Sequence, residues 1–266
     1  MKTVLSIAGS DCSGGAGIQA DIKTITAHSL YAMTAITALT AQNTTGVYSI
    51  ETVSADFLAA QLDCIFTDIF PDAIKTGMLA SPELIEVIAL KLSFFSAKNT
   101  VIDPVLFSTS NTPLLNINSL ELMINKLFPL ASVITPNLHE AEILSGIDIR
   151  SKSDMEKAAI SLYGKTHTAV LIKGGHLTGS ADDLLYDGDR LEWFCGKRIA
   201  NPNTHGTGCT LSSAIACNLA VGKTLSQSIQ AAKDYLSAAI ALMLDFGKGN
   251  GPLGIPWGSA PNLDRF

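Results

Sequence analysis

A glycine-rich turn stands directly before an apolar helical stretch at residues 203–216. The first backbone amides of a helix have no acceptor within the helix, and the helix dipole favours an anion beside them. Such a turn could stabilise the charge that develops on a phosphoryl group during its transfer. The residues of this turn are Gly206, Thr207 and Gly208.

Cys209 follows the turn and lies in the first turn of the predicted helix. A thiol at a helix N-terminus should have a lowered pKa, and it could act as a base or as a polar contact at an acceptor hydroxyl. The alternative is a small buried cysteine without a chemical role, which is the usual fate of a free cysteine. Beside a glycine-rich turn we favour the functional interpretation.

Polar residues that could bind a metal follow two other apolar segments. Asn137 and Glu140 come after the segment Val133–Thr135, and Asp103 comes after Thr100–Ile102. Asn137 with a glutamate three residues later also matches a helix capping box, which is the simpler interpretation. Mg²⁺ keeps several waters and uses few carboxylates, so these side chains could instead hold it through water.

Lys173 ends the apolar segment Ala169–Ile172 and precedes two glycines. An ammonium at the end of a strand could bridge the phosphates during transfer. A single lysine is more often solvated, but the apolar run before this one places it at a sheet edge above a cleft. The five histidines show no metal-ligand spacing, so we assign none of them a ligand role.

The loop Gly9–Gly17 holds four glycines and directly follows the apolar segment Thr3–Ala8. Glycines allow a backbone to approach a ligand closely. The loop matches GxGxxA, but a dinucleotide site also needs an acid at the end of the second strand, and Ala41–Asn43 supplies none. Ligand contact and a plain turn both remain open. Asp21, one turn into the next helix, could reach back to a ligand or lie in solvent.

Strand and helix patterns alternate along the chain, which predicts one α/β domain over residues 1–266, with a mostly parallel sheet and helices on both faces. The predicted strands are Thr3–Ala8, Met33–Ala41, Ala73–Thr76, Thr100–Ile102, Val133–Thr135 and Ala169–Ile172, with a hairpin of Leu184–Tyr186 and Leu191–Phe194. The predicted helices are Ile18–Ala27, Ala55–Phe66, one starting at Ser81-Pro82, Gly208–Val221 and Leu225–Phe246, with capping boxes at Ser153–Glu156 and Thr224–Gln227. Ligands of such sheets bind beyond the carboxyl ends of the strands, where the residues above fall.

Composition narrows the function classes. The net charge is −6 and no basic patch is present, which excludes an ordinary nucleic-acid binder. Five scattered cysteines without CxxC spacing indicate a reducing compartment, so we expect a cytoplasmic protein. The apolar run Thr3–Ala8 is too short for a signal peptide, and the apolar stretch Ile229–Phe246 contains Lys233 and Asp234, so we expect neither a signal peptide nor a membrane span.

The motifs in this order resemble the ribokinase superfamily and, within it, the hydroxymethylpyrimidine/phosphomethylpyrimidine kinase family. The resemblance covers nearly the whole chain. The segments that carry it are 7–24, 36–47, 74–79, 101–105, 135–144, 170–176 and 203–216. It implies a three-layer αβα ribokinase-like fold, often in a homodimer. It also implies that ATP and Mg²⁺ are used to phosphorylate 4-amino-5-hydroxymethyl-2-methylpyrimidine, and then its monophosphate, in thiamine biosynthesis.

The resemblance also implies roles for individual residues. Lys173 matches the lysine that contacts the ATP phosphates. Asn137 and Glu140 match the element that organises Mg²⁺ beside ATP, and Cys209 stands where most sugar kinases of the superfamily carry a catalytic aspartate. The residues that match the anion hole are Gly206, Thr207, Gly208 and Cys209, and those that match the pyrimidine contacts are Gly9, Asp21, Gln42 and Met78.

Two positions depart from the family pattern, and two alternatives remain. Asn111 replaces a usual glycine, and Leu253–Ile255 stands where a histidine is common. A pyridoxal kinase, or an enzyme acting on both rings, shares these motifs, and Gln42 is the residue that discriminates against it. A non-catalytic ligand-sensing module should have lost Lys173, Glu140 or the glycine-rich turn, and all are present.

Overall fold

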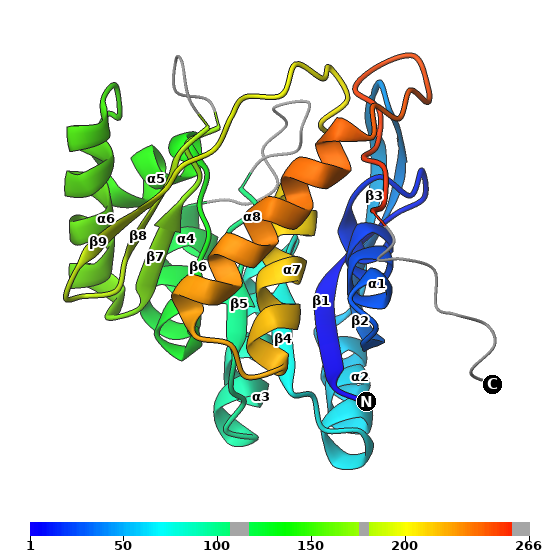
Figure 1. Cartoon of the computed structure of the whole chain (residues 1–266). Helices are drawn as coiled ribbons and strands as arrows, with labels where there is room; N and C mark the ends of the chain where they lie inside the picture. Colours follow the sequence, from blue (N-terminus) through cyan, green and yellow to red (C-terminus); the bar gives the residue numbers. More distant parts are fainter. Residues whose placement is uncertain (107–116, 176–180, 257–266) are drawn as a thin grey trace.

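The computed structural model describes residues 1–106, 117–175 and 181–256. Within these residues the centre is a nine-stranded sheet in the order β3-β2-β1-β4-β5-β6-β7-β8-β9 (Figure 1). The strands are β1 (Thr3–Asp11), β2 (Tyr31–Asn43), β3 (Gly46–Thr52), β4 (Ala73–Thr76), β5 (Thr100–Ile102), β6 (Val133–Ile134), β7 (Ala169–Ile172), β8 (Asp183–Tyr186) and β9 (Leu191–Phe194). The six strands β2, β1, β4, β5, β6 and β7 pair with one another in parallel. Antiparallel pairing joins β3 to β2, β8 to β7, and β9 to β8.

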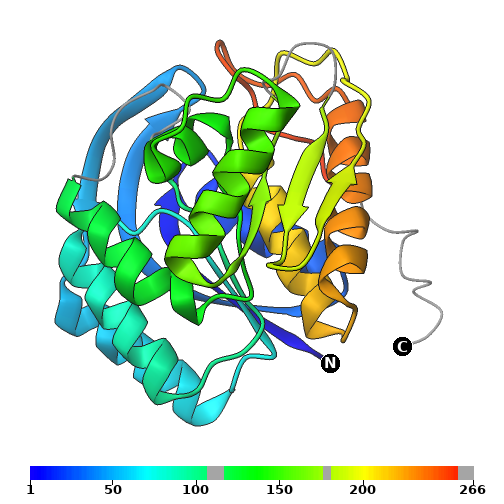
Figure 2. The ribbon, with the colours of Figure 1, turned by 90° about the vertical axis from the view of Figure 1, so that its left-hand side faces the viewer.

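Helices cover both faces of the sheet, which makes three layers (Figure 2). One face carries α1 (Gly17–Ala27), α7 (Thr207–Ala220) and α8 (Leu225–Ala241). The other carries α2 (Ala55–Asp68), α3 (Pro82–Phe94), α5 (Leu138–Ser145) and α6 (Lys152–Thr166), together with α4 (Ile117–Leu122) and the π- and 3₁₀-helical turns Met123–Leu127 and Phe128–Leu130.

Two hydrophobic cores lie on opposite sides of the sheet because neighbouring residues of a strand point to opposite faces. Val4 and Val101 pack in the core under α1, α7 and α8. Leu5 and Ile102, the next residues along, pack in the core under α2, α3, α5 and α6. A strand buried on both faces must be apolar throughout, and this explains the continuous apolar runs in the sequence.

Most of the predicted elements are confirmed; two predictions differ from the structure, and one strand was not predicted. Helix α6 starts at a Ser151 cap, whose side chain accepts a hydrogen bond from the Asp154 N–H, so the capping box at Ser153–Glu156 is wrong. Helix α8 ends at Ala241 and not at Phe246, because Met243 adopts a left-handed φ of 49°. Strand β3 was not predicted, because most of its residues are exposed and give no apolar run.

The carboxyl ends of the parallel strands lie along one edge of the sheet, and the loops that follow them carry most of the candidate site residues. Helix α7 begins at the same edge, at the glycine-rich turn. In the described part of the chain, no helix is long and apolar enough to cross a membrane.

Candidate active site

Three neighbouring strand ends bring Asp103, Asn137 and Lys173 together. Asp103 follows β5, Asn137 caps helix α5 after β6, and Lys173 follows β7. The Lys173 N–H donates to the Pro136 carbonyl oxygen at 2.9 Å, and the backbones of Asn137 and Lys173 form a parallel bridge. The residues predicted to bind phosphate and metal therefore occupy adjacent positions.

The Lys173 ammonium is paired with Asp103. Its Nζ lies 2.7 Å from Asp103 Oδ1, which also accepts a hydrogen bond from Thr135 Oγ1 at 3.2 Å. Burial lowers the pKa of Lys173, but Asp103 and Glu140 more than offset this, so the pKa is raised and the ammonium stays charged. A Cβ atom added at Gly208 would lie 3.3 Å from Asp103 Oδ2 and 3.5 Å from Lys173 Nζ. The first turn of α7 therefore lies against this ion pair.

The N-terminus of α7 is a turn that only glycine fits. Gly206 is the N-cap with φ 90°, in the left-handed region, and no side chain caps the helix. A Cβ atom at Gly206 would collide with the carbonyl oxygen of Gly15, so the two glycine-rich loops touch. Amides of the first helical turn have no acceptor in the helix and suit an anion.

Asn137 and Glu140 form the capping box that the sequence allows. Asn137 Oδ1 accepts from the Glu140 N–H at 2.9 Å, and Glu140 Oε2 accepts from the Asn137 N–H at 2.8 Å. Burial raises the pKa of Glu140 to about 7; Lys173 opposes this shift and Asp103 adds to it. The capping role and a place beside the phosphate site are thus compatible.

The same residues fit a Mg²⁺ ion. Asp103 and Glu140 are two buried carboxylates that interact with one ammonium, Lys173, so a further positive charge is favoured there. No cluster of three or more histidine, cysteine or acidic side chains that could hold a metal exists among the described residues. Mg²⁺ matches such a partial shell, because it binds through one or two carboxylates together with water and phosphate oxygens.

The residues predicted to contact a pyrimidine lie around the end of β1. A Cβ atom at Gly9 would lie 3.4 Å from Met78 Sδ, and Thr37 Oγ1 donates to the Met78 carbonyl oxygen at 2.6 Å. Gln42 lies on β2, the neighbour of β1, and is only partly buried. These residues come from the adjacent strands β1 and β2 and from the loop after β4.

Asp21 is buried and not solvated. Its carboxylate bonds to Lys75 Nζ at 2.9 and 2.8 Å, and it accepts from Ser6 Oγ at 2.5 Å and Ser213 Oγ at 2.7 Å. Both partners of the ion pair are fully buried. The Asp21 carboxylate is therefore occupied inside the protein, and a ligand would meet it only through the groups that cover it.

The prediction of a lowered pKa at Cys209 is wrong. Burial raises the pKa of this thiol to about 11, and the opposing effects of Lys75 and the Gly17 amide do not overcome it. Asp21 and Asp103 also disfavour the thiolate. Cys209 is thus a neutral thiol near pH 7, located between the Asp21–Lys75 pair and Asp103.

The model of the Phosphomethylpyrimidine kinase family matches residues 11–254. The chain belongs to this family. It is 47% identical over 253 residues to a hydroxymethylpyrimidine/phosphomethylpyrimidine kinase of Rhizobium meliloti, covering 94% of this chain and 95% of that protein. It is 46% identical over 252 residues to the thiamine biosynthesis bifunctional protein ThiED of Geobacter sulfurreducens, covering 94% of this chain but only 51% of that protein.

Solved structures share the fold across the chain. A phosphomethylpyrimidine kinase from Clostridium difficile superposes with a TM-score of 0.81 at 41% identity, covering 90% of this chain and 100% of that one. The pyridoxal kinase of Bacillus subtilis in its ADP complex gives 0.89 at 38% identity, covering 97% and 98%. The predicted ribokinase-like fold and family are confirmed.

Two polar residues of this phosphomethylpyrimidine kinase family member were missed in the sequence. Lys75 lies in the apolar strand β4 and neutralises Asp21; a lysine inside a buried strand was the signal. His205 immediately precedes the glycine-rich turn and bonds to Asp11 and Gln42. The spacing of the histidines indicates no metal site, and it contains no signal for the hydrogen bonds of His205. His176 and Asn111 lie outside the described residues.

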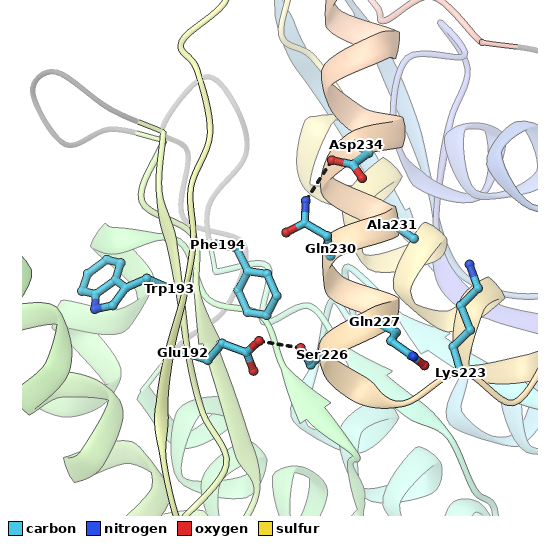
Figure 3. A pocket seen from close by; sticks show the side chains of 9 residues that line it. All are labelled: Glu192, Trp193, Phe194, Lys223, Ser226, Gln227, Gln230, Ala231 and Asp234. Atoms are coloured by element: carbon cyan, nitrogen blue, oxygen red, sulfur yellow. Dashed lines mark hydrogen bonds between the residues drawn. The ribbon is translucent and has the colours of Figure 1, made fainter.

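A cavity of about 560 Å³ lies apart from these family motifs, between the edge strand β9 and helix α8 (Figure 3). Its lining residues are Glu192, Trp193, Phe194, Lys223, Ser226, Gln227, Gln230, Ala231 and Asp234. Glu192 and Ser226 face each other across it and are joined by a 2.6 Å hydrogen bond. None of the predicted site residues lines it, so we do not assign the chemistry of the family to this cavity.

Proposed function

We propose that the chain transfers a phosphoryl group from ATP to the hydroxymethyl group of 4-amino-5-hydroxymethyl-2-methylpyrimidine. The monophosphate is then phosphorylated to the diphosphate, in thiamine biosynthesis. The observation that carries this proposal is a set of contacts at one sheet edge. Gly9 lies against Met78, Gln42 lies beside His205 just before the glycine-rich turn, and Lys173 pairs with Asp103 at the first turn of α7. Curated relatives with these activities in their names cover nearly the whole chain.

Lys173, Asp103 and the first turn of α7 form the part of the site that would hold the transferring phosphoryl group. The Lys173 ammonium and the amides of Gly206, Gly208 and Cys209 bind phosphate oxygens and stabilise the charge that spreads over them in transfer; the Thr207 N–H already donates to the Thr204 carbonyl oxygen. The pyridoxal kinase of Staphylococcus aureus, 35% identical with a TM-score of 0.87, was solved with the ATP analogue AMP-PCP, which supports ATP as the donor. Asp103, Asn137 and Glu140 would hold Mg²⁺, which supplies charge neutralisation on the phosphates.

Cys209 contributes as a neutral thiol. Phosphoryl transfer proceeds through a loose transition state in which positioning and electrostatic stabilisation matter more than a strong base. With its pKa raised to about 11, the thiol is a hydrogen-bonding and packing partner for the acceptor hydroxyl. The proposal therefore keeps Cys209 at the acceptor and removes its role as an ionised base.

A pyridoxal kinase is the second candidate, because solved pyridoxal kinases superpose closely on this chain. The pyrimidine is favoured because Gln42 offers both an N–H donor and a carbonyl acceptor, which match a ring nitrogen beside an exocyclic amine. The intact Lys173, Glu140 and glycine-rich turn do not support a ligand sensor without activity.

The test is ADP release with ATP and Mg²⁺ on hydroxymethylpyrimidine, its monophosphate and pyridoxal in parallel. We expect turnover of both pyrimidines and little of pyridoxal. Gln42→Met should raise KM for hydroxymethylpyrimidine about tenfold, because it removes both hydrogen bonds to the ring. Gln230→Met, on the exposed side of α8, is the matched control and should leave KM unchanged. A preference for pyridoxal, or an unchanged KM in Gln42→Met, would contradict the substrate assignment.

A homodimer in the cytoplasm completes the proposal. Strand β3 is an edge of the sheet, and the β2–β3 pair exposes the apolar side chains Leu39, Tyr48 and Ile50. An exposed edge with apolar side chains is a natural surface for a second copy. All five cysteines are free, which supports a reducing compartment.

A further inference from the structure

His205 is enclosed between the two glycine-rich loops. Its side chain is 4% exposed, and its Nε2 lies 2.8 Å from Asp11 Oδ2. A Cβ atom at Gly15 would collide with Cδ2 of the imidazole, so the Cδ2 edge of the ring packs against the loop. The same Nε2 lies 3.1 Å from the side-chain amide of Gln42. One ring nitrogen of His205 therefore contacts both the acid of the loop and the residue proposed to read the pyrimidine.

The Asp11 carboxylate is an acceptor on both oxygens. Oδ1 accepts from the N–H and Oγ of Ser13 at 2.8 and 2.7 Å, and Oδ2 accepts from the N–H groups of Gly15 and Ala16 at 3.1 and 2.9 Å. Burial alone would raise the pKa of Asp11, but the bonds from His205 and Ser13 lower it well below the usual range. An ionised carboxylate has no proton to give, so the proton between Asp11 and His205 is on Nε2.

This proton decides how the Gln42 amide is oriented. A protonated Nε2 has no lone pair and cannot accept a hydrogen bond from the Gln42 NH₂ group. The amide atom beside His205 must therefore be the carbonyl oxygen, and oxygen and nitrogen of an amide are assigned from such a network. The NH₂ group then faces Thr40 Oγ1, at 3.3 Å, whose own proton goes to the Ser10 carbonyl oxygen at 3.0 Å. The Nε2 proton is then shared between Asp11 Oδ2 and the Gln42 oxygen, and one N–H of Gln42 donates to Thr40.

We infer that His205, held by Asp11, fixes the orientation of the Gln42 amide and thereby determines which hydrogen-bonding pattern of a ring the site accepts. This inference rests on the proposed function and goes beyond it by assigning a positioning residue for ring specificity. With its oxygen toward His205 and its nitrogen toward Thr40, Gln42 has one N–H and one lone pair left for a ligand. A 4-aminopyrimidine offers a ring nitrogen acceptor beside an amine donor, whereas its 4-oxo analogue offers a ring N–H donor beside an oxygen acceptor.

The test compares the binding of these two rings by calorimetry. The probes are 4-amino-5-hydroxymethyl-2-methylpyrimidine and the 4-oxo compound of the same shape, titrated into the full-length protein. His205→Phe keeps a ring against Gly15 but removes the Nε2 proton, so the amide can rotate to suit either ring. We expect the preference of the wild type for the amino ring to fall about tenfold in this variant, the size of one hydrogen bond. His205→Gln places an N–H near the position of Nε2 and should restore the preference.

A second variant makes the outcome independent of the fold around His205. Thr40→Val removes the other anchor of the amide and should reduce the same preference, with thermal unfolding close to that of the wild type. If folded His205→Phe or Thr40→Val keeps the wild-type preference for the amino ring, this inference is overturned but the proposed function is not. A wild type that binds neither pyrimidine would overturn the proposed function and this inference with it. A loss of affinity that is equal for both rings would indicate a structural role and would also overturn the inference.

Discussion

Burial determines the chemistry of Cys209 more than its position on the helix does. The thiol pKa is raised to about 11, so only about one Cys209 side chain in a thousand is a thiolate at pH 8. We predict that Cys209 is alkylated by iodoacetamide far more slowly than the exposed Cys12, Cys64 and Cys195, and that its rate still rises about tenfold per pH unit at pH 9. Mass spectrometry of each cysteine peptide measures these rates.

The control for this prediction is the same alkylation in urea, where all cysteines should react alike. Rapid reaction of Cys209 at pH 7 in the folded protein would contradict the neutral thiol and would revive its role as an ionised base.

Lys75 and Asp21 form the second residue-scale feature with a measurable consequence. Lys75→Met would leave the Asp21 carboxylate buried without its cation, and breaking a buried pair in this way costs about 3–5 kcal/mol. Urea unfolding should show this loss in the free energy of unfolding. Lys91→Met, which breaks the partly exposed pair of Lys91 with Asp63, is the matched control and should cost less than about 1 kcal/mol. Equal losses in the two variants would refute the burial argument.

Among the helices and strands, the start of α7 carries two glycines whose substitution should have different effects. Gly206→Ala should lower stability, and Gly208→Ala should lower activity. Gly206→Ala should destabilise the protein, because φ is 90° and the added Cβ collides with the Gly15 carbonyl oxygen. Gly208→Ala should fold at least as well, since alanine is about 1 kcal/mol better than glycine within a helix. Its Cβ would, however, lie 3.3 Å from Asp103 Oδ2 and 3.5 Å from Lys173 Nζ, at the phosphate site.

Steady-state kinetics and urea unfolding of the two variants together check this prediction. Gly208→Ala should lose kcat or ATP affinity while keeping its stability, and Gly206→Ala should lose stability first. A fully active Gly208→Ala would place the phosphates elsewhere.

The sequence predicted the elements whose signal is local. Ala73–Thr76, Thr100–Ile102 and Ala169–Ile172 are rich in apolar residues because both faces of each strand are buried, and their limits agree with the structure. The exposed strand β3 has no such signal, because its pairing with β2 is made by the backbone and leaves most side chains in solvent.

The candidate site was predicted less completely, for a related reason. Lys173 and Asp103 follow strands and could be placed by topology alone. The charge state of Cys209 depends on groups from three distant segments, and the contact of His205 with Asp11 joins residues 194 positions apart. Such properties are set by tertiary packing, and no single local pattern contains them.

For the molecule as a whole, the β2–β3 edge of the sheet is the surface proposed to bind a second copy. We predict that Leu39→Glu reduces dimerisation in light scattering after gel filtration, because it places a charge on the apolar surface of the β2–β3 pair. Phe94→Glu, at an exposed apolar position on α3, is the control and should leave the mass unchanged. A wild type that is monomeric at high concentration would remove the homodimer proposal.

The contact between Asp11 and His205 also has a consequence during synthesis. A ribosome that adds roughly 5–20 residues per second needs about 10–40 s to pass from one to the other. During that interval only α1 can cover the Val4 face of the nascent β1, because α7 and α8, which complete this core, do not yet exist. The Asp21 carboxylate likewise cannot accept its hydrogen bond from Ser213 until α7 has been made. The newly made N-terminal half therefore exposes apolar surface of the kind that chaperones bind, and the proposed active site is complete only when the last helices leave the exit tunnel.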